Sequence, residues 1–332
     1  MVLVTGGTGF LGSHLLIHLL ENEENVRAIY RNKSKIAKVK LLFSAAEKSD
    51  LFEKIEWIKA DILDVSALEI AFKGIDYVYH CAGLISYDPD DETALRKTNI
   101  EGTANIVNLC LDHNIKKLCH VSSIAALGDR KPNENEITEE NEWNPETAHS
   151  DYAISKYGAE MEIWRGQQEG LNVVIVNAGV IFGAGFWNQG SGLFFSAVKK
   201  GFPFYTNGST GYIGVFDVVK IMIGLMESSI AGERFITVAE NITFKKIIFD
   251  IAENLNVKKP TIEATPCYLN AAWRLDWLVS KIFRTKRKLS KYSVAALLQD
   301  DKILNTKIKN ALNFEFQSMD NVIKEVVVLY DD

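Results

Sequence analysis

The chain of 332 residues has few cysteines, no excess of basic charge and no long apolar run. Its four cysteines, Cys81, Cys110, Cys119 and Cys267, form no C-x-x-C pair, which favours free thiols in a reducing compartment. The net charge of -6 argues against a nucleic-acid-binding protein, which usually carries a basic face. No apolar run approaches the length that spans a bilayer and no secretory signal precedes Val2, so we expect a cytoplasmic protein.

A metal site is also not expected. His80-Cys81 and Cys119-His120 bring together residue types that bind metals, but each pair is adjacent in the sequence. Neighbouring residues on a strand point to opposite faces of a sheet, so neither pair can turn both side chains toward one ion.

The first half of the chain alternates between strand and helix patterns. We expect strands at residues 2–5, 26–30, 55–59, 77–81, 118–122 and 173–177, and helices at 10–20, 65–72, 93–114 and 152–169. This alternation predicts an α/β fold with a doubly wound parallel sheet of Rossmann type. We assign residues 1–180 to this domain. Residues 181–332 are less regular, and we expect them to form a smaller, mixed α/β substrate-binding region intertwined with the first.

The first expected strand runs into a glycine-rich turn. Thr5-Gly6-x-x-Gly9-x-x-Gly12 follows a strand and opens a helix, which is the context that binds a dinucleotide pyrophosphate. Gly6 permits the tight turn, Gly9 lets the backbone approach the phosphates, and Gly12 lets the helix pack on the sheet. The backbone of Thr8, Phe10 and Leu11 then faces the phosphates at the positive end of the helix. The alternative is a glycine turn without a ligand.

The end of the second strand indicates which nicotinamide nucleotide is bound. An acidic residue there would bind the ribose diol, whereas arginine accommodates a 2′-phosphate. Arg31 stands at this point, and no Asp or Glu occurs from residue 25 to 46. Arg31 therefore favours NADP over NAD, with Lys38 as a second phosphate contact. The alternative is a solvated basic stretch at the start of a helix.

Two further strand ends are predicted to meet the cofactor. Asp61-Ile62 follows the third strand and is placed to meet the adenine. Cys81-Ala82-Gly83 follows the fourth strand and can let the backbone lie along the dinucleotide.

The candidate chemistry lies about 140 residues after the glycine turn. Tyr152 and Lys156 are one helical turn apart, so they share a helix face. An ammonium beside a phenol stabilises the phenolate, and we expect Lys156 to lower the pKa of Tyr152 into a useful range for acid–base catalysis. Ser122 and Ser123 end the fifth strand at the sheet edge where such folds bind ligands, and a serine there can polarise a carbonyl. The alternative is that these serines only cap the strand.

In order and separation, these motifs resemble the extended class of the short-chain dehydrogenase/reductase superfamily, also described as the NAD-dependent epimerase/dehydratase family. Asn99, before Ile100-x-Gly102-Thr103, matches an asparagine of that class. The resemblance implies that Tyr152 is the catalytic acid/base, Lys156 orients the nicotinamide ribose, Ser123 binds the reacting oxygen and Asn99 shapes the site.

Within the class, the chain is most similar to the dihydroflavonol 4-reductase and 3β-hydroxysteroid dehydrogenase branch. Residues 26–31 resemble its V-R-A-x-x-R segment, and residues 176–183 resemble its N-P-G-x-x-x-G run. This run implies cofactor contacts from Asn177, Gly179 and Val180, together with Ser122. The resemblance also implies a homodimer formed by residues 103–113 and 152–165.

Three functions follow. The first is an NADP-preferring oxidoreductase that interconverts a ketone or aldehyde and an alcohol. The second is a nucleotide-sugar epimerase or dehydratase, although residues 211–217 lack the arginine and histidine typical of the epimerases. Ile124 stands where sugar epimerases often carry serine or threonine, and if that position is the catalytic one, Ser123 does not have the catalytic role. The third is a cofactor-binding sensor or scaffold without turnover, against which the intact Tyr152-Lys156 pair argues.

Residues 267–291 combine apolar and aromatic side chains with a basic end. Three interpretations stay open: a packed helix with a solvated end, an apolar lid over a partly apolar substrate, or a helix on an anionic membrane surface. Trp187 and Phe194-Phe195 either line the same pocket or belong to the core.

Overall fold

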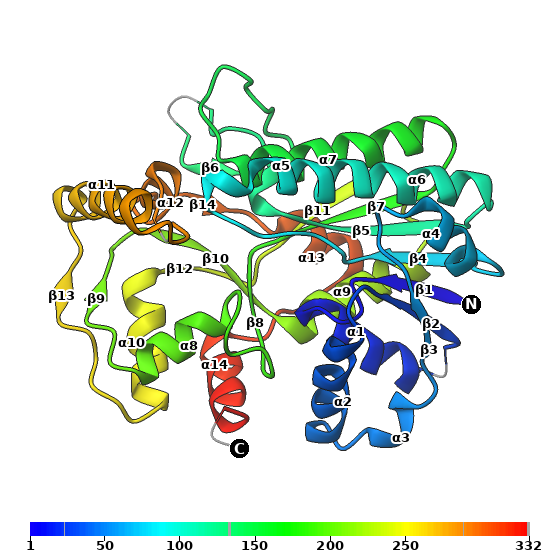
Figure 1. Cartoon of the computed structure of the whole chain (residues 1–332), viewed down its shortest axis with the longest axis horizontal. Helices are drawn as coiled ribbons and strands as arrows, with labels where there is room; N and C mark the ends of the chain where they lie inside the picture. The colour runs from blue at the N-terminus through cyan, green and yellow to red at the C-terminus, as the bar shows by residue number, and fades with distance from the viewer. Residues whose placement is uncertain (23, 132–133, 288, 331–332) are drawn as a thin grey trace.

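The computed structural model describes residues 1–22, 24–131, 134–287 and 289–330. A seven-stranded sheet with the order β11-β7-β5-β4-β1-β2-β3 forms its centre, and every neighbouring pair in it is parallel (Figure 1). The strands are β1 (Val2–Thr5), β2 (Val26–Tyr30), β3 (Glu56–Lys59), β4 (Tyr77–His80), β5 (Lys117–Ser123), β7 (Val173–Ala178) and β11 (Glu233–Thr237). The expected Rossmann-type sheet is confirmed.

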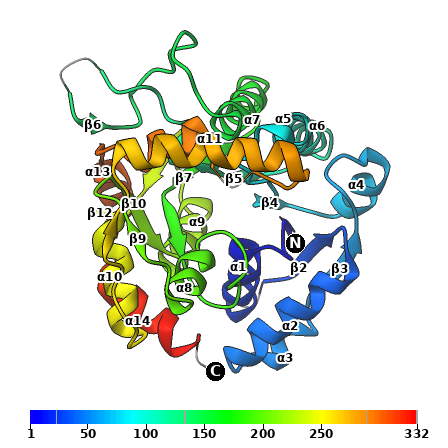
Figure 2. The same ribbon diagram turned by 60° about the vertical axis from the view of Figure 1, so that its left-hand side comes forward.

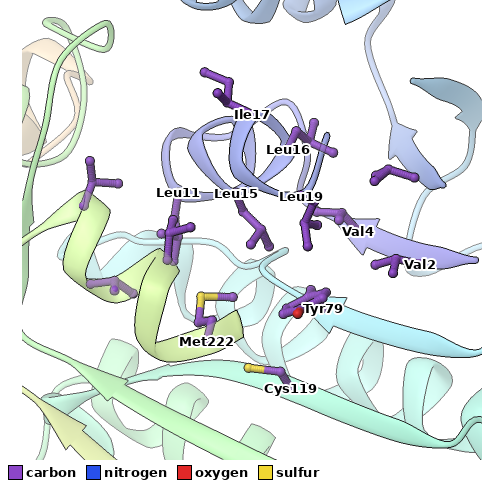
Figure 3. Close-up of a cluster of buried hydrophobic side chains, with 14 of the residues drawn as sticks. Val2, Val4, Leu11, Leu15, Leu16, Ile17, Leu19, Tyr79, Cys119 and Met222 are labelled. Carbon is purple, nitrogen blue, oxygen red and sulfur yellow. The ribbon is translucent and has the colours of Figure 1, made fainter. Parts of the chain in front are cut away.

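Helices cover both faces of this sheet. On one face lie α1 (Phe10–Glu21), α2 (Ile36–Ala45), α3 (Ser49–Phe52) and α9 (Val215–Glu227). Leu11, Leu15 and Leu19 of α1 point toward Met222 of α9 and Tyr79 of β4 in the core (Figure 3). On the other face lie α4 (Val65–Phe72), α6 (Gly102–Asp112) and α7 (Asp151–Gln168). Because both faces are buried, β1, β2 and β7 are each apolar at all but one position.

The helix expected over residues 93–114 is interrupted. It consists of α5 (Glu92–Leu95), a π-helical stretch (Arg96–Glu101) and α6. Such π segments widen the turn locally and often occur at functional sites. Here the segment contains Asn99, which is buried.

The second half of the chain builds a smaller lobe and also completes the first. A three-stranded sheet holds β8 (Val180–Phe182), β10 (Ser209–Gly214) and β12 (Glu240–Thr243). The helices α8 (Gly192–Lys199), α10 (Phe244–Asn254) and α14 (Met319–Val328) share an apolar core with this sheet (Figure 2). Meanwhile α9 and β11 return to the seven-stranded sheet and its helix layer. Segments on both sides of residue 180 thus build the first domain, and the expected division of the chain at that residue stays a prediction.

The remaining elements are short, apart from α11. They are β6 (Glu136–Ile137), β9 (Phe204–Tyr205), β13 (Ile262–Glu263), α11 (Pro266–Phe283), α12 (Lys291–Ala296), β14 (Lys302–Ile303) and α13 (Thr306–Leu312). Within the described ranges, no helix is both long and apolar enough to cross a bilayer.

Candidate active site

The glycine turn after β1 leaves no room for larger residues. Gly6 has φ +69°, and a Cβ on it would lie 2.6 Å from the amide nitrogen of Ala82. A Cβ on Gly12 would lie 2.3 Å from the carbonyl oxygen of Gly6, so α1 can sit this close to the turn only with glycine there. The Ala82 amide also donates a hydrogen bond to Thr5 Oγ1 at 3.2 Å. The structure thus brings the predicted segment 81–83 against the turn.

The start of α1 is suited to bind phosphate. Gly9 is the N-cap and offers no side-chain cap, and the first turn contains no acidic residue. The side chains of Phe10 and Leu11 are used elsewhere, because Phe10 packs against Phe186 and Leu11 is buried in the core. The first backbone N–H groups of a helix have no partner within it, so they remain available to a phosphate. Together with the close-packed glycines, this end of α1 fits a dinucleotide pyrophosphate.

The basic residues expected at the adenosine end separate into two places. Arg31 lies 3.6 Å from Asp61, between its Nη1 and a carboxylate oxygen, and both side chains are exposed to solvent. Lys38 lines a cavity of about 710 Å³ between α1, α2, the loop at 182–189 and α14. Neither Arg31 nor the glycine turn lines that cavity. Arg31 is therefore the basic side chain that the structure places beside Asp61.

Ile62 has a packing role. A Cβ on Gly102 would lie 2.5 Å from Ile62 Cδ1, so the isoleucine side chain fills the space over that glycine. Its carbonyl oxygen accepts a hydrogen bond from Asn105 Nδ2 at 3.0 Å. The β3–α4 connection is thereby held against α6.

Tyr152 lies in the first turn of α7 and is buried, with 8% of its surface exposed. The Ser150 hydroxyl caps this helix by accepting the Ala153 N–H at 3.1 Å. Burial raises the pKa of the Tyr152 phenol, the neighbouring Tyr87 raises it further, and a hydrogen bond with Ser123 opposes the rise. The prediction that Lys156 lowers this pKa is wrong in this structure. Helical spacing places Lys156 one turn from Tyr152, but it does not show that the phenol is buried, and the loss of water around the phenol has the largest effect on its pKa.

Lys156 is buried with its ammonium directed at the end of β5. Its Nζ donates a hydrogen bond to the carbonyl oxygen of Val121 at 2.8 Å. Burial lowers the pKa of Lys156 to about 8, while the negative charge of Glu160 opposes that change. A Cβ on Gly83 would lie 4.0 Å from Lys156 Nζ and 3.5 Å from Asn99 Oδ1. Both are ordinary van der Waals distances, so Gly83 lies directly against the lysine and the asparagine without being crowded by them.

Asn99 is tied to the loop after β4 and to α7. Its Oδ1 accepts the Leu84 N–H at 2.7 Å, and its Nδ2 donates to the Leu84 carbonyl oxygen at 3.0 Å. The same Nδ2 donates to Ser155 Oγ at 2.9 Å. Asn99 thus fixes the loop that approaches Tyr152 and Lys156, which agrees with a role in shaping the site.

A buried acidic residue behind Lys156 was not predicted. Glu160 is fully buried, and its carboxylate accepts Asn177 Nδ2 at 2.6 Å and lies 3.4 Å from Arg234 Nη1. Asn177 Nδ2 also donates to the Ser123 carbonyl oxygen at 3.0 Å. The signal that could have revealed Glu160 is its spacing, since it lies one further turn along the face that carries Tyr152 and Lys156.

The other predicted cofactor contacts near β7 have structural roles in this structure. The Asn177 amide nitrogen is engaged by Glu160 and Ser123, and Ser122 is buried. A Cβ on Gly179 would lie 2.5 Å from the Gly211 carbonyl oxygen, so this glycine permits close packing on β10. Val180 begins β8, where it pairs with Tyr212.

The segment after α11 lies beside Tyr152. A small pocket is lined by Tyr152 together with Ser86, Tyr87, Asp88, Pro89, Ser150, Asp151, Ser290 and Tyr292. The Arg287 N–H donates to Asp88 Oδ2 at 3.1 Å, and Lys286 Nζ lies 3.3 Å from Asp91 Oδ2. By contrast, Phe195 is fully buried and packs with Trp187 and Phe194 in the core around β8.

The comparisons with known proteins agree with this fold. Residues 2–237 match the model of the NAD dependent epimerase/dehydratase family, and the chain belongs to that family. It is 28% identical over 288 residues to a putative dihydroflavonol 4-reductase from Synechocystis sp., covering 84% of this chain and 78% of the relative. It is 30% identical over 247 residues to tetraketide alpha-pyrone reductase 2 from Arabidopsis thaliana, covering 70% of this chain and 76% of the relative.

Solved structures share the whole architecture. The crystal structure of gox2253 aligns with a TM-score of 0.81 at 23% identity, covering 100% of this chain and 98% of that one. A UDP-glucose 4-epimerase from Thermotoga maritima, solved with UDP-glucose, aligns with a TM-score of 0.78 at 20% identity, covering 99% and 98%. At these identities the likeness establishes the fold.

Proposed function

We propose that this protein is an NADP-preferring oxidoreductase that interconverts a ketone or aldehyde and the corresponding alcohol. The observation that carries the proposal is the buried group at the start of α7, where Tyr152 is buried and Lys156, one turn further along, donates a hydrogen bond to Val121 at the end of β5, the strand that carries Ser123. The reductase names among the relatives favour this activity over the alternatives.

Each residue has a distinct role in the reducing direction. A bound nicotinamide supplies the hydride, or accepts it in the reverse direction. Tyr152, whose pKa is raised by burial, holds its proton at neutral pH and can donate it to the carbonyl oxygen. The Ser123 hydroxyl stabilises the negative charge that develops on this oxygen. Lys156 and Gly83 border the path along which the nicotinamide ribose would lie.

Stoichiometry tests the proposal most simply. Purified protein is mixed with NADPH and a panel of ketones and aldehydes, and both the loss of NADPH absorbance and the alcohol formed are measured. We expect one NADPH consumed for each alcohol formed. Turnover of a nucleotide sugar without net consumption of the nucleotide would instead support an epimerase or dehydratase; an epimerase is the activity named for the Thermotoga structure.

The preference for NADP rests on Arg31. Its side chain is exposed, so a 2′-phosphate at the end of β2 can reach the guanidinium even though the Asp61 carboxylate lies 3.6 Å from it. We expect Arg31→Ser to reduce the ratio of NADPH to NADH affinity by about tenfold, equivalent to about 1.4 kcal/mol. Lys33→Ser removes a nearby exposed charge and serves as the matched control. An unchanged ratio in the Arg31 variant would contradict the assignment.

A further inference from the structure

Helix α11 exposes most of its surface to solvent. Of its 18 residues, Leu269 is the only one that is buried. Leu275, Ile282 and Phe283 are 62%, 63% and 68% exposed. Figure 1 shows α11 at the outer edge of the molecule, beside α12. The interpretation of this segment as a packed helix is therefore wrong for most of its length.

The exposed apolar side chains form one continuous stripe. Ala271, Leu275, Leu278 and Ile282 follow the spacing that places residues on a single helix face. Each of them is exposed. The opposite face, which includes Leu269 and Trp273, packs against Val294, Leu297 and Leu298 at and just after the end of α12. One side of α11 thus holds it to the protein, and the apolar stripe faces away.

Basic residues border this stripe. Residues 266–291 contain seven lysines and arginines and a single aspartate, in a chain whose net charge is -6. Arg274 and Lys281 lie on α11 itself, and Arg284 follows directly as its exposed C-cap. An apolar stripe with a basic border is the pattern of a helix that lies in the interface of an anionic bilayer.

We propose that α11 docks on the surface of a membrane that contains anionic phospholipids, with its apolar stripe in the interface and its basic border on the headgroups. The charge of the segment distinguishes this partner from a second copy of the chain. A second copy would bring the same basic border against this one, and like charges repel. The proposal does not depend on the proposed reaction.

Vesicle co-sedimentation tests the docking. The full chain is mixed with vesicles of phosphatidylcholine alone and with vesicles that also contain phosphatidylglycerol. We expect binding to the mixed vesicles, weaker binding at high salt, and little binding to phosphatidylcholine alone. The double variant Leu275→Ser/Ile282→Ser is expected to bind mixed vesicles at least about tenfold more weakly.

Two controls keep the result interpretable. Leu41→Ser/Ile70→Ser removes a leucine and an isoleucine that are 70% and 57% exposed on α2 and α4, and it should bind like the unaltered protein. The thermal unfolding midpoint of both variants should equal that of the unaltered protein. Lys281→Gln/Arg284→Gln should weaken binding to the mixed vesicles only.

Three results would overturn the proposal. In the first, the unaltered protein stays in the supernatant with both kinds of vesicle. In the second, the stripe variant binds mixed vesicles as tightly as the control. In the third, sedimentation velocity shows a dimer that the stripe variant breaks while no vesicle binds, which would assign the stripe to a second copy of the chain.

Discussion

Helices α7 and α11 have the same length of 18 residues but opposite relations to the protein around them. Eight residues of α7 are buried, among them the polar Ser155, Lys156 and Glu160. In α11, one residue is buried, although its sequence is much richer in leucine, tryptophan and phenylalanine. A prediction from composition alone would therefore have placed α11 in the core and α7 on the surface.

The difference shows what each helix is built to hold. Burying a charged side chain is unfavourable unless it has partners. The buried charged side chains of α7 have theirs on neighbouring strands, in Val121, Asn177 and Arg234. Such a set of buried, paired groups is typical of a site that performs chemistry. An exposed apolar stripe also needs an explanation, and an interaction surface is the usual one.

The largest expected contrast between the two helices is in turnover. Tyr152→Phe removes the proton donor at the start of α7, and we expect turnover to fall by about 10²- to 10⁴-fold. Tyr268→Phe makes the same change on α11, where the side chain is exposed, and should leave turnover unchanged. Steady-state rates with a substrate found in the carbonyl panel provide the measurement. Equal rates for Tyr152→Phe and the unaltered protein would remove α7 from the chemistry.

The next contrast is in stability. Ile163 of α7 is fully buried, so Ile163→Ala should lower the free energy of unfolding by about 2–5 kcal/mol. Ile282→Ala removes the same atoms from α11, where the side chain is exposed, and should change it by no more than about 0.5 kcal/mol. Urea denaturation of the two variants gives both values. A similar loss in both would mean that α11 is packed more tightly than the structure shows.

The smallest effect concerns pH. Burial lowers the pKa of Lys156 to about 8, so the lysine is charged below that pH and neutral above it. We expect nicotinamide nucleotide affinity to fall as the pH rises through about 8, because the charged donor is lost. The carboxylate of Glu160 raises the pKa of Lys156, so Glu160→Gln should move this fall to lower pH.

The control for this shift lies on the same helix. Glu162 of α7 pairs with Arg165 near the surface. Glu162→Gln should leave the midpoint of the pH dependence where it is in the unaltered protein. Nucleotide titrations across the pH range measure the midpoint for the unaltered protein and for each of the two variants. Equal midpoints for Glu160→Gln and Glu162→Gln would rule out an effect of Glu160 on Lys156.

Much of the fold could be predicted because the central strands are apolar runs between recognisable turns. The six strands expected in the first half all occur within a residue or so of their predicted ends. The short strands β8, β10 and β12 were missed, since stretches of three to six residues among glycines show little periodicity. The place of β11 in the main sheet was also missed, because pairing between distant segments leaves no local pattern.

The candidate site was predicted in its parts and less well in its environment. The glycine turn and residues 81–83, each proposed from its own motif, lie against one another in the structure, and their contact with a cofactor stays a prediction. It could not show that burial dominates the pKa of Tyr152, because desolvation depends on how the whole domain packs. Glu160 and Arg234 come from distant segments, so their pairing required the tertiary structure.

A nicotinamide nucleotide bound beside α7 is the central claim, and titration of the purified protein with NADPH and NADH, followed by nicotinamide fluorescence, tests it most directly. The account predicts saturable binding of both nucleotides, with NADPH bound more tightly. Saturable binding with NADH preferred would contradict the role of Arg31. Binding of neither nucleotide would contradict the assignment of the glycine turn and, with it, the proposed reaction.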